Sequence, residues 1–196
     1  MKVSIYYDFR CPFANNMTNF LGKAQSQGIS LDITWIPFSL ALNNSRKENL
    51  NVNPKQNKAN WNAFVFFEWV QLKYPDKTFE VIQEIFKARH QLGKDHNSLT
   101  TLENVALSCG LGRIVIKDIL KDKELYNSVE KKHFNGVKLG VFGVPTLVYD
   151  NNNIVFIKML LPDDKDVKNI LYTLETLIEK QTIIGEIKRP QPPWPL

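Results

Sequence analysis

The chain contains few of the residues from which metal centres and disulfide frameworks are built. Its 196 residues include two cysteines and three histidines. Two cysteines in this length do not make a disulfide framework, and the histidines show no metal-ligand spacing. A glycine-rich phosphate-binding motif and an internal repeat are also missing. We therefore expect no metal centre and no covalently bound cofactor.

Long hydrophobic runs and targeting signals are missing as well. No stretch approaches the roughly 20 apolar residues that span a bilayer, and the first residues alternate like a strand rather than forming a signal peptide. The formal charge is +5, with 25 basic residues against 20 acidic ones. The lysines are scattered, whereas nucleic-acid binding needs a clustered basic face. These features indicate a soluble cytoplasmic protein that binds neither nucleic acid nor a membrane.

Length and periodicity predict one α/β domain covering residues 1–196, of which 43% are apolar. The pattern is that of a strand over residues 2–8, a helix over 11–28 and a second strand over 29–38, which together form a βαβ unit. Turn residues around position 151 join two further strands into a hairpin. The predicted hairpin strands and final helix cover 144–149, 154–159 and 163–180.

Residues 54–138 have helical patterns throughout, and no flexible linker flanks them. We therefore expect an all-helical subdomain inserted into the α/β domain. Its predicted helices cover 54–72, with Asn53 as cap and Pro54 as first residue, then 79–92, a helix opened by a capping box at 100–103, 113–121 and 123–138. The aromatic stripe that includes Trp61 and Phe64 indicates core packing. The proline-rich tail, 189–196, is expected to be extended.

Cys11 lies at the junction between the first strand and the first helix, directly before Pro12. Proline suits the first turn of a helix, where its missing N–H would have no partner. Cys11 is then at or next to the N-cap, where free N–H groups and the helix dipole stabilise a thiolate, to which Arg10 would add. We predict a pKa below about 8.5. The alternative is that Cys11 packs as a small buried hydrophobe.

A second segment, residues 140–150, runs from a glycine-flanked loop into a β-rich stretch. Its Val144–Pro145 bond stands where a strand opens. Such a bond can be cis and fix a tight turn, or it can be an ordinary trans bond at a strand start.

The two segments together, Cys11-Pro12-Phe13-Ala14 and Val144-Pro145-Thr146, resemble the DsbA-like branch of the thioredoxin superfamily. The similarity is closer to 2-hydroxychromene-2-carboxylate isomerases and kappa-class glutathione transferases, through residues 5–9, 35–40 and 88–95. It covers nearly the whole chain. The resemblance implies a thioredoxin-like fold whose helical insertion covers the Cys11 end as a lid. It also implies glutathione or another low-molecular-weight thiol as partner, bound by the Val144 backbone.

One departure from the family pattern concerns the chemistry. Redox members carry a second cysteine where this chain has Ala14, so Cys11 cannot form the local disulfide of a dithiol cycle. Cys109 ends an apolar helical run and is expected to be packed. His90 is either a catalytic partner of Cys11 or a surface or capping histidine. The predicted site consists of Cys11 as catalytic residue and seven substrate-binding residues: Arg10, Pro12, Phe13, His90, Val144, Pro145 and Thr146.

Three functions follow from these residues. The first is thiol–disulfide chemistry in which Cys11 forms a mixed disulfide or adduct with a small thiol or thiol-containing substrate. The second is a glutathione-dependent isomerase or transferase in which Cys11 activates a bound thiolate without attacking it. The third is a non-catalytic binding module on the same fold. A homodimer remains open as the assembly state.

Overall fold

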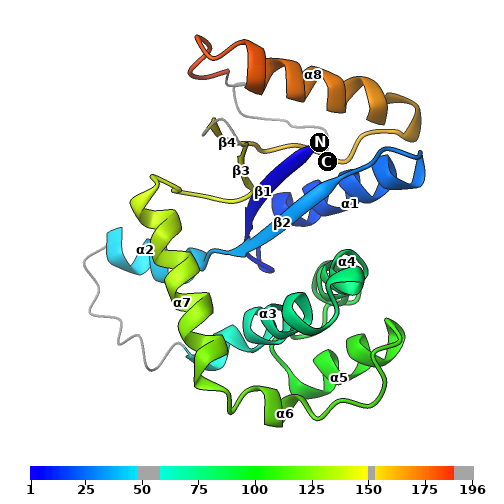
Figure 1. Cartoon of the computed structure of the whole chain (residues 1–196), viewed down its shortest axis with the longest axis vertical. Coiled ribbons are helices and arrows are strands. Elements are labelled where there is room, and N and C mark those ends of the chain that lie inside the picture. Colours follow the sequence, from blue (N-terminus) through cyan, green and yellow to red (C-terminus); the bar gives the residue numbers. More distant parts are fainter. Residues whose placement is uncertain (48–57, 150–152, 188–196) are drawn as a thin grey trace.

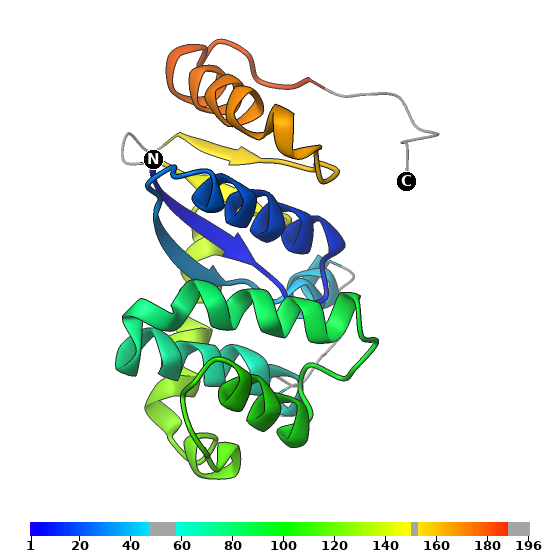
Figure 2. The ribbon, with the colours of Figure 1, turned by 90° about the vertical axis from the view of Figure 1, so that its right-hand side faces the viewer.

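The structure is a computed structural model, and it describes residues 1–47, 58–149 and 153–187. Figures 1 and 2 show the arrangement of the elements in two perpendicular views. The strands are β1 (Lys2–Tyr7), β2 (Asp32–Pro37), β3 (Thr146–Val148) and β4 (Ile154–Phe156). The helices are α1 (Pro12–Ser26), α2 (Leu40–Lys47), α3 (Asn62–Lys73), α4 (Thr78–His90), α5 (Leu99–Ser108), α6 (Ile116–Ile119), α7 (Lys123–Lys138) and α8 (Val167–Lys180), with short 3₁₀ turns at Lys58–Trp61, Pro75–Lys77 and Asp164–Asp166.

The strands form one mixed sheet in the order β2-β1-β3-β4. β1 pairs in parallel with β2 and antiparallel with β3, and β4 closes an antiparallel hairpin with β3. The predicted βαβ unit and hairpin are therefore confirmed, as is the α/β class. Because β1 and β3 run in opposite directions, the residues after β1 lie beside the residues before β3. This antiparallel pairing brings the segment around Cys11 and the segment around Val144 to the same end of the sheet.

Helices cover both faces of the sheet. α1 contacts α4 on one side and α8 on the other, as Figure 2 also shows. α7 packs against Tyr6, whose side chain points away from the face of Ile5 and Tyr7 because strand side chains alternate. Gly136 of α7 permits this close approach: a Cβ there would lie 2.7 Å from the Tyr6 ring. The sheet is thus enclosed between two helical layers.

Between β2 and β3 the described residues form helices and no strand. Their aromatic side chains meet the end of β1 around the buried ring of Tyr7. The rings within 6.5 Å of Tyr7, centroid to centroid, are those of Phe9, Trp35, Phe64, Phe67 and Phe86. The aromatic stripe is therefore core, as predicted. Edge-to-face rings of this kind add to the free energy gained from burial alone.

An ion pair between buried Glu68 and half-buried Lys132 joins α3 to α7. Glu68 is 3% exposed and accepts hydrogen bonds from Lys132 Nζ at 2.6 and 2.8 Å and from Ser128 Oγ at 2.7 Å. A carboxylate taken out of water is tolerated when its oxygens are satisfied in this way. Removing Lys132 alone would leave the charge of Glu68 buried without its cation.

The sequence did not predict α2. Its residues lie in a stretch that is polar from Asn43 onward, yet a helix begins directly after β2. Ser39 caps it, since the Leu42 N–H donates to Ser39 Oγ at 3.3 Å. Buried Asn43 donates from Nδ2 to the carbonyl of Phe142 at 3.3 Å. A serine before a short helix is a recognisable start signal, and the polar residues after it masked the signal.

The predicted capping box at 100–103 is wrong, because α5 begins at Leu99 with Ser98 as its N-cap and both threonines lie inside the helix. β4 is shorter than predicted. Beyond it the chain turns to α1, where Asn16 Nδ2 donates to the carbonyl of Met159 at 3.0 Å. The predicted helix start at residues 53–54 and the extended tail at 189–196 lie outside the described residues.

Candidate active site

Cys11 is the N-cap residue of α1, with extended backbone angles of −82° and 118°, and Pro12 is the first helical residue. The loop from β1 is closed by a hydrogen bond from the Cys11 N–H to the Asp8 carbonyl at 2.9 Å. The side chain is buried, at 7% exposure. The predicted N-cap position of Cys11 is confirmed, and it follows from the local rule that proline begins a helix.

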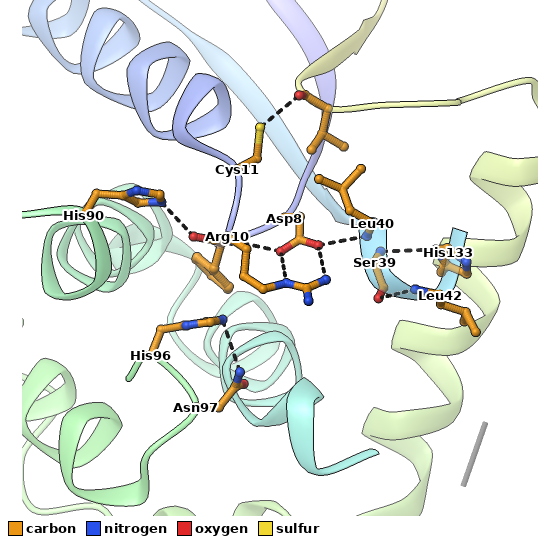
Figure 3. Close-up of polar contacts among 12 residues, drawn as sticks. Asp8, Arg10, Cys11, Ser39, Leu40, Leu42, His90, His96, Asn97 and His133 are labelled. Atoms are coloured by element: carbon orange, nitrogen blue, oxygen red, sulfur yellow. Dashed lines mark hydrogen bonds and ion pairs between the residues drawn. The ribbon is translucent and has the colours of Figure 1, made fainter. Parts of the chain in front are cut away.

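The segment before β3 lies directly opposite Cys11. The Val144–Pro145 peptide bond is cis, and the Cys11 thiol donates a hydrogen bond to the Val144 carbonyl at 3.1 Å (Figure 3). Buried Thr146 holds the loop, since its hydroxyl donates to the Gly143 carbonyl at 2.7 Å. Residues 133 positions apart in the sequence thus meet at one sulfur.

The electrostatics of Cys11 differ from the prediction. Burial raises the pKa of the thiol, and the Asp8 carboxylate adds to the rise, while the backbone N–H groups of Ala14 and Phe13 and the Lys158 ammonium lower it. The net direction is upward, so the predicted depressed pKa is wrong. The helix N-terminus acts in the expected sense, but desolvation of the sulfur outweighs it. A carbonyl that accepts from the thiol also favours the protonated form.

Arg10 does not face the sulfur. Its guanidinium binds the Asp8 carboxylate, from Nε at 3.3 Å and from an Nη at 3.1 Å, and its backbone N–H donates to the same carboxylate at 2.9 Å. Asp8 also accepts from the Leu40 N–H at 2.8 Å. Asp8 is 1% exposed, and its carboxylate ties the Cys11 loop to α2 (Figure 3). Sequence reasoning missed this role, although an acidic residue ending a buried strand was a signal.

His90 supports the same loop from the helical layer. Its Nε2 lies 2.9 Å from the Phe9 carbonyl, to which it donates as the Nε2–H tautomer. Burial lowers the pKa of His90 and the bond to Phe9 raises it less, so the ring is neutral near pH 7. The hydrogen bond described for His90 therefore goes to the loop backbone rather than to the Cys11 sulfur. This contact holds the loop before Cys11, which is neither the predicted catalytic pairing with Cys11 nor a helix cap.

Phe13 and Pro12 lie on the outer side of the site. Pro12 is exposed and Phe13 is half-buried. Lys158, which follows β4, places its Nζ 5.5 Å from the centroid of the Phe13 ring. No sequence pattern pointed to Lys158, because its approach to α1 depends on the hairpin and on the turn of the chain after it.

Cys109 is packed, as predicted. It is the C-cap of α5 and 1% exposed, and burial raises the pKa of its thiol to about 11. Both cysteines are free. Ala14, the position of the second cysteine in the family's redox motif, is buried one helical turn after Cys11.

Residues 1–47, 58–149 and 153–187 contain no group of three histidine, cysteine or acidic side chains placed to hold a metal ion. In the same part of the chain, no helix combines the length and the apolar character needed to cross a membrane.

With this geometry in hand, comparison with known families gives a clear match. The family model for the DsbA-like thioredoxin domain matches residues 2–175. The chain belongs to the DsbA-like thioredoxin family. No curated protein matches the sequence.

Solved structures share the fold at low sequence identity. A 2-hydroxychromene-2-carboxylate isomerase superposes with a TM-score of 0.67 at 16% identity, covering 95% of this chain and 100% of that one. The cytosolic disulfide reductase DsbM from Pseudomonas aeruginosa, solved with GSH, gives 0.62 at 12% identity and covers 89% and 98%. DsbA from the same organism gives 0.54 at 17% identity and covers 94% and 85%. This DsbA-like thioredoxin fold agrees with the subgroup resemblance.

Proposed function

We propose that this DsbA-like protein catalyses thiol–disulfide exchange with Cys11 as its single reacting cysteine. One observation carries the proposal: the Cys11 sulfur lies at the N-terminus of α1 and 3.1 Å from the Val144 carbonyl. The sulfur thus has helix N–H groups on one side and a backbone acceptor for a ligand on the other. The solved structures that share this fold include a disulfide reductase with GSH, which supports glutathione or a similar small thiol as partner.

The exchange proceeds in two displacements. Cys11 loses its proton to solvent, and the thiolate attacks one sulfur of a substrate disulfide. The S–S bond breaks, a mixed disulfide forms with Cys11, and the other sulfur leaves as a thiolate that takes a proton from solvent. A small thiolate then attacks the substrate sulfur of the mixed disulfide and forms a new disulfide with it, while Cys11 leaves as a thiolate that takes a proton from solvent. Both steps are ordinary exchange reactions, and no second protein cysteine takes part.

The Val144 carbonyl has a defined part in this scheme. While it accepts the thiol hydrogen, it holds Cys11 in its protonated form. A substrate whose N–H donates to this carbonyl takes the place of the thiol, as extended peptides do when they pair with exposed backbone. Cys11 then loses an interaction that favours protonation. Binding and activation of the nucleophile are coupled in this way.

A reducing compartment is part of the proposal, because a single-cysteine cycle needs a pool of small thiols to regenerate Cys11. We therefore propose the cytoplasm as the place of action. The cytosolic DsbM supports this through its fold alone.

A glutathione-dependent isomerase is the second candidate. The observation that favours it is the protonated state of Cys11: burial raises the pKa of the thiol, and the thiol donates a hydrogen bond in the described structure. A thiol that donates can orient and activate a bound thiolate without attacking anything. The fold shared with the isomerase supports the same candidate.

Intact-mass measurement separates the two candidates. The wild-type protein, Cys11→Ser and Cys109→Ser are each incubated with oxidised glutathione. Exchange chemistry predicts a single glutathione adduct on the wild type and on Cys109→Ser, and none on Cys11→Ser. An adduct absent from all three proteins, together with glutathione binding that Cys11→Ser retains, would favour the isomerase and overturn the exchange proposal.

A further inference from the structure

A lysine lies between two aromatic rings at the rim of the site. The Nζ of Lys158 is 5.5 Å from the ring centroid of Phe13 and 5.7 Å from that of Phe156. Both rings are half-buried, while Lys158 itself is exposed. A cation over aromatic faces is held by the ring quadrupoles. The ammonium thus has a defined position while staying open to solvent.

The two rings connect Lys158 to the reacting sulfur. Phe13 belongs to the first turn of α1, two residues after Cys11. The Phe156 ring packs on Gly143, where a Cβ would come within 3.0 Å of the ring. Gly143 directly precedes Val144, whose carbonyl accepts from the thiol. Lys158 is therefore positioned by the helix on one side of the sulfur and by the loop on the other.

The charge of Lys158 is available to a ligand and acts at the sulfur. Within the described parts of the chain, no carboxylate forms an ion pair with Lys158. The nearby Asp8 carboxylate is buried and bound to Arg10. The Lys158 ammonium also lowers the pKa of Cys11. A negative group on a substrate at Cys11 would meet this ammonium.

An exposed aromatic ring adds an apolar surface. Phe142 is 57% exposed, and its ring lies 5.0 Å from that of Phe156. Large exposed aromatic side chains that adjoin a site are typical of ligand contacts. Phe142 and Lys158 thus both contact the Phe156 ring, one with an apolar ring and the other with a cation.

We propose that Lys158 and Phe142 select, for reaction at Cys11, disulfides that join a carboxylate to an apolar body. The carboxylate meets the Lys158 ammonium, and the apolar part packs on Phe142. This inference rests on the proposed exchange reaction. The Cys11 thiolate attacks one sulfur of the substrate disulfide, a mixed disulfide forms between Cys11 and that half as the S–S bond breaks, and the other half leaves as a thiolate. The Lys158 ammonium keeps its proton throughout.

A pair of aromatic disulfides tests the charge preference. The first, 5,5′-dithiobis(2-nitrobenzoate), carries two carboxylates, and the second, 2,2′-dithiodipyridine, is neutral near pH 8. Second-order rate constants are measured for both reagents in a Cys109→Ser background, so that only Cys11 reacts. The measured quantity is the ratio of the rate constant for the anionic reagent to the rate constant for the neutral reagent. A change in thiol acidity alters both rates equally and cancels in this ratio.

Lys158→Met is expected to lower the ratio about 1.5- to fivefold, the range of an exposed ion pair. Lys158→Glu should lower it further, and added salt should lower the ratio of the parent protein but not that of Lys158→Met. Lys117→Met is the matched control for net charge, since Lys117 lies in α6 at the far end of the helical layer (Figure 1). Phe142→Ala should slow both aromatic reagents while leaving their ratio unchanged.

Two results would overturn the inference. If Lys158→Met slows both reagents by the same factor, Lys158 acts only on the acidity of the thiol, and the proposed selection is wrong while the exchange function stands. If Cys11 of the parent protein reacts with neither reagent, the exchange function itself fails and the inference fails with it.

Discussion

Cys11 and Cys109 are both buried thiols at helix ends, and they occupy opposite ends. Cys11 is the N-cap of α1 and Cys109 is the C-cap of α5. Burial raises the pKa of both. At Cys11 two backbone N–H groups of the first turn oppose the rise. At Cys109 two glutamates of α4 add to it, and its pKa reaches about 11.

Burial therefore does not distinguish the reactive cysteine from the packed one. The two are 7% and 1% exposed, a difference too small to decide their chemistry. The direction of the helix and the charges around the sulfur decide it, because the N–H groups at the start of α1 stabilise a thiolate at Cys11, whereas the Glu80 and Glu84 carboxylates destabilise one at Cys109. Four experiments test this contrast.

The largest effect is expected from a second cysteine. In Ala14→Cys, the new thiol lies three residues after the N-cap Cys11, the spacing of the family's redox motif, so a disulfide should form under mild oxidation and insulin-reducing activity should appear. The matched control is Ala106→Cys, three residues before Cys109 on α5 and also buried. We expect no disulfide there. Failure of Ala14→Cys to form one, by intact mass, would contradict the family geometry of this site.

Alkylation rates give the next effect. At pH 8 iodoacetamide should modify Cys11 faster than Cys109, because burial raises the pKa of Cys109 to about 11, whereas the N–H groups at the start of α1 oppose the rise at Cys11, and each pKa unit changes the thiolate fraction tenfold. Peptide mass mapping over time measures both rates in one sample. Faster modification of Cys109 in the folded protein would reverse the assignment of the reactive thiol.

Stability at alkaline pH tests the packed cysteine. The unfolded pKa of cysteine is about 8.5, and the folded pKa of Cys109 is about 11, so the folded state binds more protons between these values. The stabilisation is complete below about pH 8.5 and is lost as the pH rises to about 11. Cys109→Ala has no thiol and so does not lose this stability. The difference between its free energy of unfolding and that of wild type should therefore shift in favour of the variant by about 2 kcal/mol between pH 8 and pH 10.5. Urea titrations measure this change. Cys11→Ala should show a smaller gain, and an equal gain in both variants would contradict the contrast.

Local rules carried much of the prediction. Proline after Cys11 fixed the start of α1, and alternating apolar residues identified β1 and β2. The meeting of Cys11 with Val144 came from the family resemblance, since no local rule joins residues 133 positions apart.

The features that the sequence did not predict depend on packing at a distance. The raised pKa of Cys11 follows from desolvation, which is set by the loop that covers the sulfur rather than by the helix that contains it. Lys158 reaches Phe13 only because the chain after β4 turns back to α1. The hydrogen bonds of Asp8 join the Cys11 loop to the start of α2, which lies 32 residues further along the chain. The sequence did not predict α2 because its residues are polar from Asn43 onward.

The smallest effect is expected at Arg10. Its guanidinium is 36% exposed and bound to Asp8, so Arg10→Gln should change the alkylation rate of Cys11 by less than about twofold and lower stability by about 1 kcal/mol. The backbone N–H groups of Arg10 and Leu40 still satisfy Asp8 in this variant. Asp8→Ala is the contrast, because it leaves those two N–H groups without their acceptor and should cost about 2–3 kcal/mol. Alkylation quenched at timed intervals measures the rate at Cys11, and urea titration measures the free energy of unfolding. If Arg10→Gln instead slows the alkylation of Cys11 tenfold and leaves stability unchanged, Arg10 activates the thiol as a cation. That result would contradict the role inferred from its guanidinium bound to Asp8.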